Sequence, residues 1–185
     1  VDITDRSSLK RAASEVIKKF GKIDILITNA ALNPAPGSSG ENNWVPYEKF
    51  SEALWDEELL INLTGSHRTV QAIAPHMMRR HSGSIILVAS DLALIGPQNR
   101  LYEKGKFKDI AYITSKAGIL GLTRAWAAYL GPYNVRVNAL APGGMENKQL
   151  VAFVKKNSEL NMLGRMSRNG EYNGAIIFLA SDASS

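Results

Sequence analysis

Apolar positions alternate between helical and strand spacing along the whole chain. They recur at helical spacing from Leu9 to Phe20, between a candidate N-cap, Asp5, and a candidate stop, Gly21, so a helix is predicted there. The short apolar run at 23–27 that follows predicts a buried strand.

The same alternation continues to the end of the chain. Helices are predicted at about 47–81, with bends near 62–65 and near Pro75, and at 110–130, 149–156 and 171–180. Strands are predicted at 84–89 and 135–140, and residues 1–4 are also strand-like. Loops are predicted at 33–43 and 91–110. Helices alternating with near-continuously apolar strands indicate an α/β fold, in which a doubly wound parallel sheet carries helices on both faces.

The length and the two ends of the sequence bear on domain organisation. Its 185 residues predict a single domain, 1–185. The sequence begins inside a strand-like segment and ends at 180–185 without a closing element. We therefore expect a partial domain, truncated at the N-terminus and at the C-terminal strand.

Composition excludes several functional classes. There is no cysteine, which rules out disulfides, thiolate metal sites and a cysteine nucleophile and favours a cytoplasmic protein. No apolar run is long enough to cross a bilayer. The net charge of +5 comes from scattered bases, so solvated helix faces are expected rather than nucleic-acid binding. His67, His76 and His81 do not share a helix face, and no metal site is predicted.

A tyrosine and a lysine four residues apart are the strongest candidates for chemistry. Tyr112 and Lys116 open the predicted helix 110–130 on one face, where a nearby ammonium favours the phenolate and lowers the tyrosine pKa. Tyr102 and Lys106 share the spacing but lie in a loop that contains Gly105, so nothing would hold them in register. The context selects Tyr112 and Lys116.

Two polar residues accompany this pair. Ser90 follows the predicted strand 84–89, where a hydroxyl can stabilise charge on a substrate oxygen; a serine that starts a turn is the plainer interpretation. Asn62 interrupts an apolar helix, where its amide can bond a backbone carbonyl or hold a water, and a helix cap or kink is the alternative.

Taken together in order, these motifs resemble the short-chain dehydrogenase/reductase family almost from end to end. The shared segments are NAA at 29–31, NLTG at 62–65, GSIILVAS at 83–90, YITSKAG at 112–118 and VRVNALAPG at 135–143. The resemblance implies a Rossmann-type fold and an NAD(P)-dependent oxidoreductase that interconverts an alcohol and a carbonyl. It also implies a homo-oligomer, a dimer or tetramer, in which the helices around 62–80 and 112–130 pack across a dimer.

The resemblance assigns an active-site tetrad to Asn62, Ser90, Tyr112 and Lys116. Tyr112 would exchange a proton with the substrate oxygen, Ser90 would polarise it, Lys116 would lower the Tyr112 pKa and bond the nicotinamide ribose, and Asn62 would anchor a relay water. The implied cofactor positions, for NAD or NADP, are Asp2 and Ile3 at adenine, Asn29, Ala30 and Ala31 along the cleft, Pro142 and Gly143 at nicotinamide, and Asn147.

The sequence departs from the family pattern at several points. The glycine-rich phosphate-binding turn and the residue that chooses NAD or NADP precede Val1 in the family, so residues 1–185 alone are expected to bind cofactor poorly. Ala31 replaces a glycine, and Asn147 stands where the family commonly has a threonine. Twenty-one residues separate Ser90 from Tyr112, where the family usually has about a dozen.

That longer segment, 91–110, is predicted to be an inserted loop near the substrate pocket. It resembles a branch that includes flagellin-modification oxidoreductases. Arg100 or Tyr102 would then touch substrate, although a solvent-exposed loop is the plainer interpretation. Two other functions stay open: a sugar-nucleotide epimerase or dehydratase of the extended branch, and a non-catalytic binding protein on the same fold.

Overall fold

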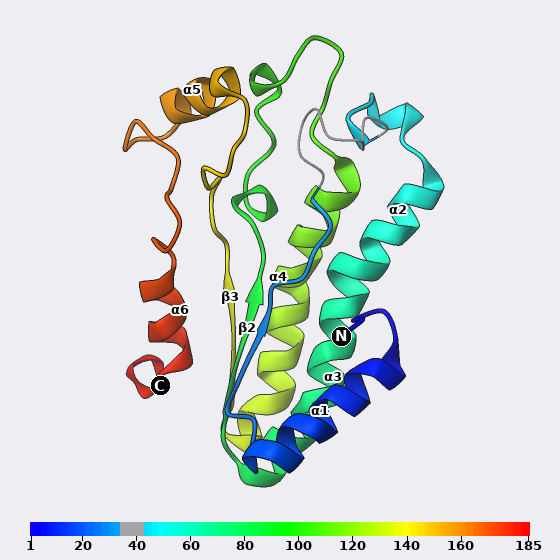
Figure 1. The fold of residues 1–185 in the computed structure, drawn as a ribbon, viewed down its shortest axis with the longest axis vertical. Coiled ribbons are helices and arrows are strands. Elements are labelled where there is room, and N and C mark those ends of the chain that lie inside the picture. The colour runs from blue at the N-terminus through cyan, green and yellow to red at the C-terminus, as the bar shows by residue number, and fades with distance from the viewer. Residues whose placement is uncertain (34–42) are drawn as a thin grey trace.

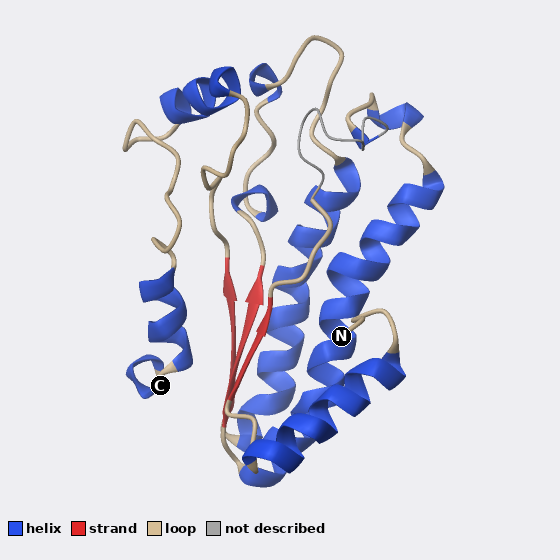
Figure 2. Ribbon diagram, viewed as in Figure 1, coloured by secondary structure: helices blue, strands red, loops and turns tan. Residues whose placement is uncertain are grey.

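A three-stranded parallel sheet forms the centre of the computed structural model, which describes residues 1–33 and 43–185 (Figure 1). The strands are β1 (Ile25–Thr28), β2 (Gly83–Val88) and β3 (Val135–Leu140), in the order β1-β2-β3. Their arrowheads point to the same end of the molecule (Figure 2). The predicted strands are therefore confirmed, with boundaries shifted by up to two residues.

The strand predicted at 1–4 is wrong. The Asp2 carboxylate accepts hydrogen bonds from the Thr4 backbone N–H at 2.8 Å and from the Thr4 hydroxyl at 2.7 Å. This side-chain-to-backbone turn competes with extended structure and leads directly to Asp5, which caps the first helix by accepting from the Ser7 N–H at 2.7 Å. Most of the loop predicted at 33–43 lies outside the described residues.

The helices agree with the predicted alternation. Gly21, in the left-handed region at φ 80°, ends the first helix as predicted. The α-helices are α1 (Arg6–Phe20), α2 (Glu52–Leu59), α3 (Ser66–Arg80), α4 (Ile110–Leu130), α5 (Val151–Leu160) and α6 (Asn173–Ala180).

The bend predicted at 62–65 is a π-helical segment, Leu60–Gly65, which joins α2 to α3. The helix α3 continues through Pro75. A π-helical turn widens the helix and often marks a functional position. Here it contains the buried Asn62.

Helices cover both faces of the sheet, as a doubly wound fold requires. On one face α3 packs on β1 and β2 and α4 packs on β3, while α1 lies along α3 (Figure 1). On the other face α6 contacts β2 and β3, and the Ser84 hydroxyl donates to the Leu179 carbonyl at 2.7 Å. The core between the sheet and α3 and α4 includes Val70, Met77, Ile85, Leu87 and Ile119.

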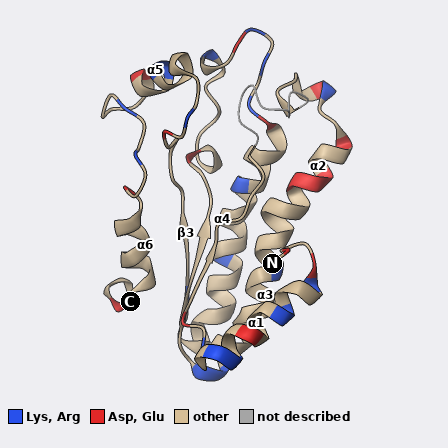
Figure 3. Cartoon of the chain, in the orientation of Figure 1, with Lys and Arg blue, Asp and Glu red and all other residues tan. Residues whose placement is uncertain are grey.

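Charged side chains are dispersed over helices and loops, and both signs are mixed in the view of Figure 3. Among the described residues, no helix is both long and apolar enough to cross a membrane.

Candidate active site

Ser90 lies just beyond the carboxyl end of β2, as predicted. Its backbone is extended and its side chain is buried, with 5% exposure. The Ser90 hydroxyl donates to Asp91 Oδ1 at 2.8 Å and accepts from the Leu92 backbone N–H at 3.2 Å. In parallel α/β sheets, this end of the strands is where ligands bind.

The first two turns of α4 bring Tyr112 and Lys116 to the same end of the sheet. Asp109 caps this helix, because its Oδ1 accepts from the N–H groups of Ala111 at 2.9 Å and Tyr112 at 3.1 Å. Tyr112 and Lys116 are both buried, with exposures of 9% and 5%. The Tyr102–Lys106 pair, by contrast, lies in a loop around Gly105, as the sequence indicated.

The pKa of Tyr112 differs from the sequence-based expectation. Burial raises it above its usual value of 10, while a hydrogen bond with Ser90 acts in the opposite direction. Lys116 is not among the causes of this shift, so its effect on the Tyr112 pKa stays a prediction. The upward shift comes from desolvation: the phenol lies in a low-dielectric region, where the charged form is disfavoured.

Lys116 is held by the backbone of β2. Its Nζ donates to the Val88 carbonyl oxygen at 2.7 Å and lies 5.8 Å from the centroid of the Tyr112 ring. Desolvation lowers the pKa of Lys116 to about 8.

Asn62 connects two of the site's segments. Its Oδ1 accepts from the Leu32 N–H at 2.7 Å, and its Nδ2 donates to the Leu32 carbonyl at 3.0 Å and to the Ser115 hydroxyl at 3.2 Å. The side chain thus ties the segment after β1 to α4, the helix that carries Tyr112 and Lys116. This network shows Asn62 as a structural tie, while its role with a relay water stays a prediction.

The predicted cofactor residues fall into two groups. Five follow the carboxyl ends of strands: Asn29, Ala30 and Ala31 after β1, and Pro142 and Gly143 after β3. Asp2 and Ile3 lie before α1 instead, and Asn147 lies four residues beyond Gly143. Ile3 packs so closely on Gly65 that a Cβ there would lie 2.7 Å from Ile3 Cδ1. Asp2 is exposed, and so is Asn147, whose N–H donates to Gln149 Oε1 at 2.6 Å.

The site's polar groups fit the nicotinamide–ribose half of a dinucleotide. Among the described residues, the buried hydroxyl of Thr28, at the carboxyl end of β1, has no hydrogen-bond partner. Lys116 is a buried ammonium whose hydrogen bond to the Val88 carbonyl uses one of its three donors. Both groups are suited to bond ribose hydroxyls or the carboxamide.

Sequence reasoning missed a buried acidic cluster behind Tyr112. Asn43 Nδ2 donates to Glu58 Oε1 at 2.6 Å and to Asp109 Oδ2 at 2.9 Å. Burial first, and then the neighbouring Asp109, raise the pKa of Glu58 to about 8. The only sequence signal is that Glu58 lies four residues before Asn62, on the same face of a helix.

Lys108 was missed as well, because a lysine in a polar loop is expected in solvent. It is instead only 6% exposed. Its Nζ lies 4.3 Å from the centroid of the Tyr112 ring and 4.9 Å from that of Trp44. Lys108 therefore places a second cation beside the reacting phenol.

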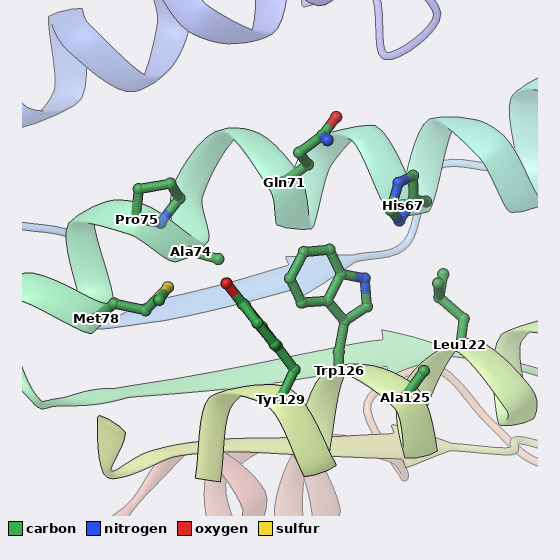
Figure 4. Close-up of a pocket in the computed structure, with 9 residues that line it drawn as sticks. All are labelled: His67, Gln71, Ala74, Pro75, Met78, Leu122, Ala125, Trp126 and Tyr129. Atoms are coloured by element: carbon green, nitrogen blue, oxygen red, sulfur yellow. The ribbon is translucent and has the colours of Figure 1, made fainter. Parts of the chain in front are cut away.

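A groove of about 430 Å³ lies elsewhere, on the outer sides of α3 and α4 (Figure 4). Trp126 and Tyr129 of α4 face Gln71 and Pro75 of α3 across it (Figure 4). None of its lining residues belongs to the predicted tetrad. The titratable groups converge at the strand-end cluster instead, which makes that cluster the candidate site.

Comparisons with known proteins agree with this geometry. The family model for enoyl-(acyl carrier protein) reductase matches residues 1–185. The chain is 32% identical to 3-oxoacyl-(acyl-carrier-protein) reductase FabG of Thermotoga maritima, over 100% of this chain and 70% of that protein.

Solved structures of dehydrogenases are also similar to this chain. A short-chain dehydrogenase from Leptospira borgpetersenii with bound NAD+ superposes with a TM-score of 0.87 at 26% identity. A gluconate 5-dehydrogenase from Burkholderia cenocepacia, in complex with NADP and tartrate, superposes with a TM-score of 0.85 at 27% identity. Both alignments cover 100% of this chain and 68% of the other. With its parallel sheet, its strand-end serine and its buried tyrosine and lysine, the chain belongs to the short-chain dehydrogenase/reductase family of NAD(P)-dependent oxidoreductases.

Proposed function

We propose that the protein interconverts an alcohol and a carbonyl compound, with Tyr112 as the general acid and base. One observation carries the proposal: the buried Tyr112 lies with Ser90 and Lys116 at the carboxyl end of the sheet. The relatives reported above are dehydrogenases and reductases, which favours this function over epimerisation, dehydration or non-catalytic binding.

Each residue has a distinct task. In the direction of reduction, the phenol of Tyr112 gives its proton to the carbonyl oxygen as that oxygen becomes negative. The Ser90 hydroxyl would turn from Asp91 to donate to the same oxygen. Lys116 stabilises the phenolate that remains, and Asn62 keeps Leu32 and α4 in register through its amide.

Residues after β1 and β3, including Asn29, Ala30 and Gly143, together with Lys116, would hold NAD or NADP. When bound, the nicotinamide would supply or accept a hydride at the carbinol carbon: the C–H bond would form as the π bond of the carbonyl opens, or break as that π bond forms. In the direction of oxidation, the O–H proton of the alcohol goes to the Tyr112 phenolate, so protons and electrons balance.

The loop 91–110 would shape the substrate pocket. In support, the ring centroid of Tyr102 lies 5.1 Å from that of Trp44 and 6.1 Å from that of Phe153, which links the loop to α5. Arg100 is exposed, so Tyr102 is the better candidate for a substrate contact.

The groove between α3 and α4 supports a homo-oligomer that packs through this face. Pro75, Met78, Ala125 and Trp126 line it, and Tyr129 is 57% exposed. Two antiparallel copies of the helix pair would bury these side chains symmetrically. The measurement is sedimentation velocity: Ala125→Glu with Tyr129→Glu should yield a smaller species, and an unchanged sedimentation coefficient would contradict the interface.

Replacement of Tyr112 tests the chemistry. With NAD+ or NADP+ and a panel of alcohols, Tyr112→Phe should lower kcat by about 10³-fold, in the range for loss of a general acid–base group. Tyr102→Phe, the tyrosine with the same lysine spacing, should keep kcat within about 3-fold. Turnover that survives Tyr112→Phe would overturn the proposal.

A further inference from the structure

Lys108 is a buried cation beside the reacting phenol, and the proposed chemistry does not use it. Its Nζ donates to Asn33 Oδ1 at 2.7 Å and lies over the rings of Tyr112 and Trp44. Burial of an ammonium costs several kcal/mol unless an opposite charge compensates it. Contacts with aromatic rings offset only a part of that cost, so most of it remains.

The carboxylates around Lys108 are engaged elsewhere. Asp109 caps α4 and accepts from Asn43. Asp91 accepts from the Ser90 hydroxyl and from the Leu92 N–H, both at 2.8 Å. Within residues 1–33 and 43–185, the ion pairs do not include Lys108.

The electrostatics agree with this picture. Desolvation lowers the pKa of Lys108 to about 8, although the negative charges of Asp109, Glu58 and Asp91 act in the opposite direction. The neighbouring acids therefore do not offset the burial of the ammonium. An anion that contacted Nζ directly would restore the pKa toward its usual value.

We propose that Lys108 binds a carboxylate of the substrate, and that the enzyme acts on a hydroxy acid and the corresponding keto acid. This inference rests on the proposed function, because it places the carboxylate relative to the oxygen that exchanges a proton with Tyr112. Nζ lies 4.3 Å from the Tyr112 ring centroid, so a few bonds separate the carboxylate from the reacting carbon. The carboxylate itself does not change in the reaction.

A carboxylate fits Lys108 better than a phosphate does. A phosphate monoester carries a charge of about −1.5 to −2 and three acceptor oxygens, and such groups are usually met by several cationic or backbone donors. Lys108 offers one positive charge, and the nearby Asp91 would repel a dianion more strongly than a monoanion. The buried Trp44 ring can pack against the carbon chain of the acid.

The test compares acids with their amides, which have the same shape and no charge. Isothermal titration and steady-state kinetics would use 3-hydroxybutyrate and gluconate, each beside its amide, with the purified protein and NAD+ or NADP+. Lys108→Met should lower the acid-to-amide ratio of kcat/KM at least about 30-fold, in the range for breaking a buried charge pair. Lys104→Met, an exposed lysine in the same loop, should leave the ratio unchanged.

The readouts separate this inference from the proposed function. Titration requires no turnover, so Lys108 is tested even if Tyr112→Phe stays active and the proposed chemistry fails. Equal binding of acid and amide by the unaltered protein, an equal loss of both in Lys108→Met, or no saturable binding of either acid at tens of millimolar would overturn the role of Lys108. Loss of acid binding as the pH rises above about 8 would support it.

Discussion

The Nζ of Lys116 donates a hydrogen bond to the carbonyl oxygen of Val88, the last residue of β2, at 2.7 Å. Ser90 lies two residues farther along the chain. A single hydrogen bond therefore fixes α4, which carries Tyr112, to the strand that leads to Ser90. This bond, rather than contact with the phenol, sets where the Lys116 charge lies.

The pH dependence of carbonyl reduction should report the titration of Lys116. The pKa of Lys116 is lowered to about 8, whereas that of Tyr112 is raised above 10. The phenol is then still protonated when the ammonium loses its proton, so kcat/KM should fall as the pH rises through about 8. The measurement is a profile of kcat/KM between pH 6 and 10, which reports the free enzyme.

Lys116→Arg provides the control for this profile. Arginine stays charged throughout this range, so the descending limb should move to higher pH, with a lower maximum because the fork-shaped guanidinium fits the Val88 carbonyl less well. Lys106→Arg, in the loop, should leave the limb where it is. A limb at the same pH in Lys116→Arg would exclude Lys116 as its origin.

Glu58 should make the folded state less stable as the pH rises. Its pKa increases on folding from 4.5 to about 8, so the folded state holds a proton that the unfolded state releases. The stabilisation is complete below about pH 4.5 and is lost as the pH rises toward 8.

Glu58→Gln removes this titration while it keeps an acceptor for Asn43. The variant should exceed the unaltered protein in free energy of unfolding by on the order of 1–3 kcal/mol at pH 8 and show a smaller difference at pH 5, as measured by urea denaturation. Glu57→Gln, an exposed neighbour, should change stability little at either pH. A difference for Glu58→Gln that does not vary with pH would contradict the buried acid pair.

A side chain at Gly118 should displace Leu63. A Cβ there would lie 2.9 Å from Leu63 Cδ2, where α4 packs on the π-helical segment. Gly118→Ala should cost about 1–3 kcal/mol of stability, as overpacking does, and should lower kcat because Leu63 adjoins Asn62. Thermal unfolding and initial rates measure the two effects.

Gly121, on the same helix, is the matched control. Nothing lies within 4 Å of a Cβ built at this position, so Gly121→Ala should stabilise the helix by about 0.5–1 kcal/mol. Equal effects at the two glycines would show that helix propensity, rather than the contact with Leu63, governs both.

Local signals predicted much of the fold. Asp5 begins α1 and Gly21 ends it, because an N-cap and a left-handed C-cap depend only on a few neighbouring residues. Parallel strands are continuously apolar because both faces are covered. The strand predicted at 1–4 failed for an equally local reason, since the Asp2 carboxylate bonds Thr4.

The candidate site was predictable only in part. Ser90 follows a strand, and Tyr112 and Lys116 lie near the start of a helix. Their positions in the alternation of strands and helices predict that the three side chains lie close together. Glu58 and Lys108 are buried by partners far along the chain: Asp109 lies near Glu58, and Asn33 bonds Lys108. Glu58 stands in an acidic run and Lys108 in a polar loop, where charged side chains are usually exposed to solvent. Only their tertiary contacts bury them.

The π-helical segment Leu60–Gly65 also constrains how this sequence can change length. A π turn accommodates one more residue than an α turn, so one residue could be removed from the segment with a return to α geometry and with α2 and α3 still in register. Removal of one residue from the α-helical turns of α2 or α3 would instead rotate the helix on one side of the deletion by about 100° about its axis, and would displace Glu58 or the residues of α3 that pack on the sheet. Single-residue deletions that spare Asn62 should therefore be better tolerated in Leu60–Gly65 than in the α-helical turns on either side of it.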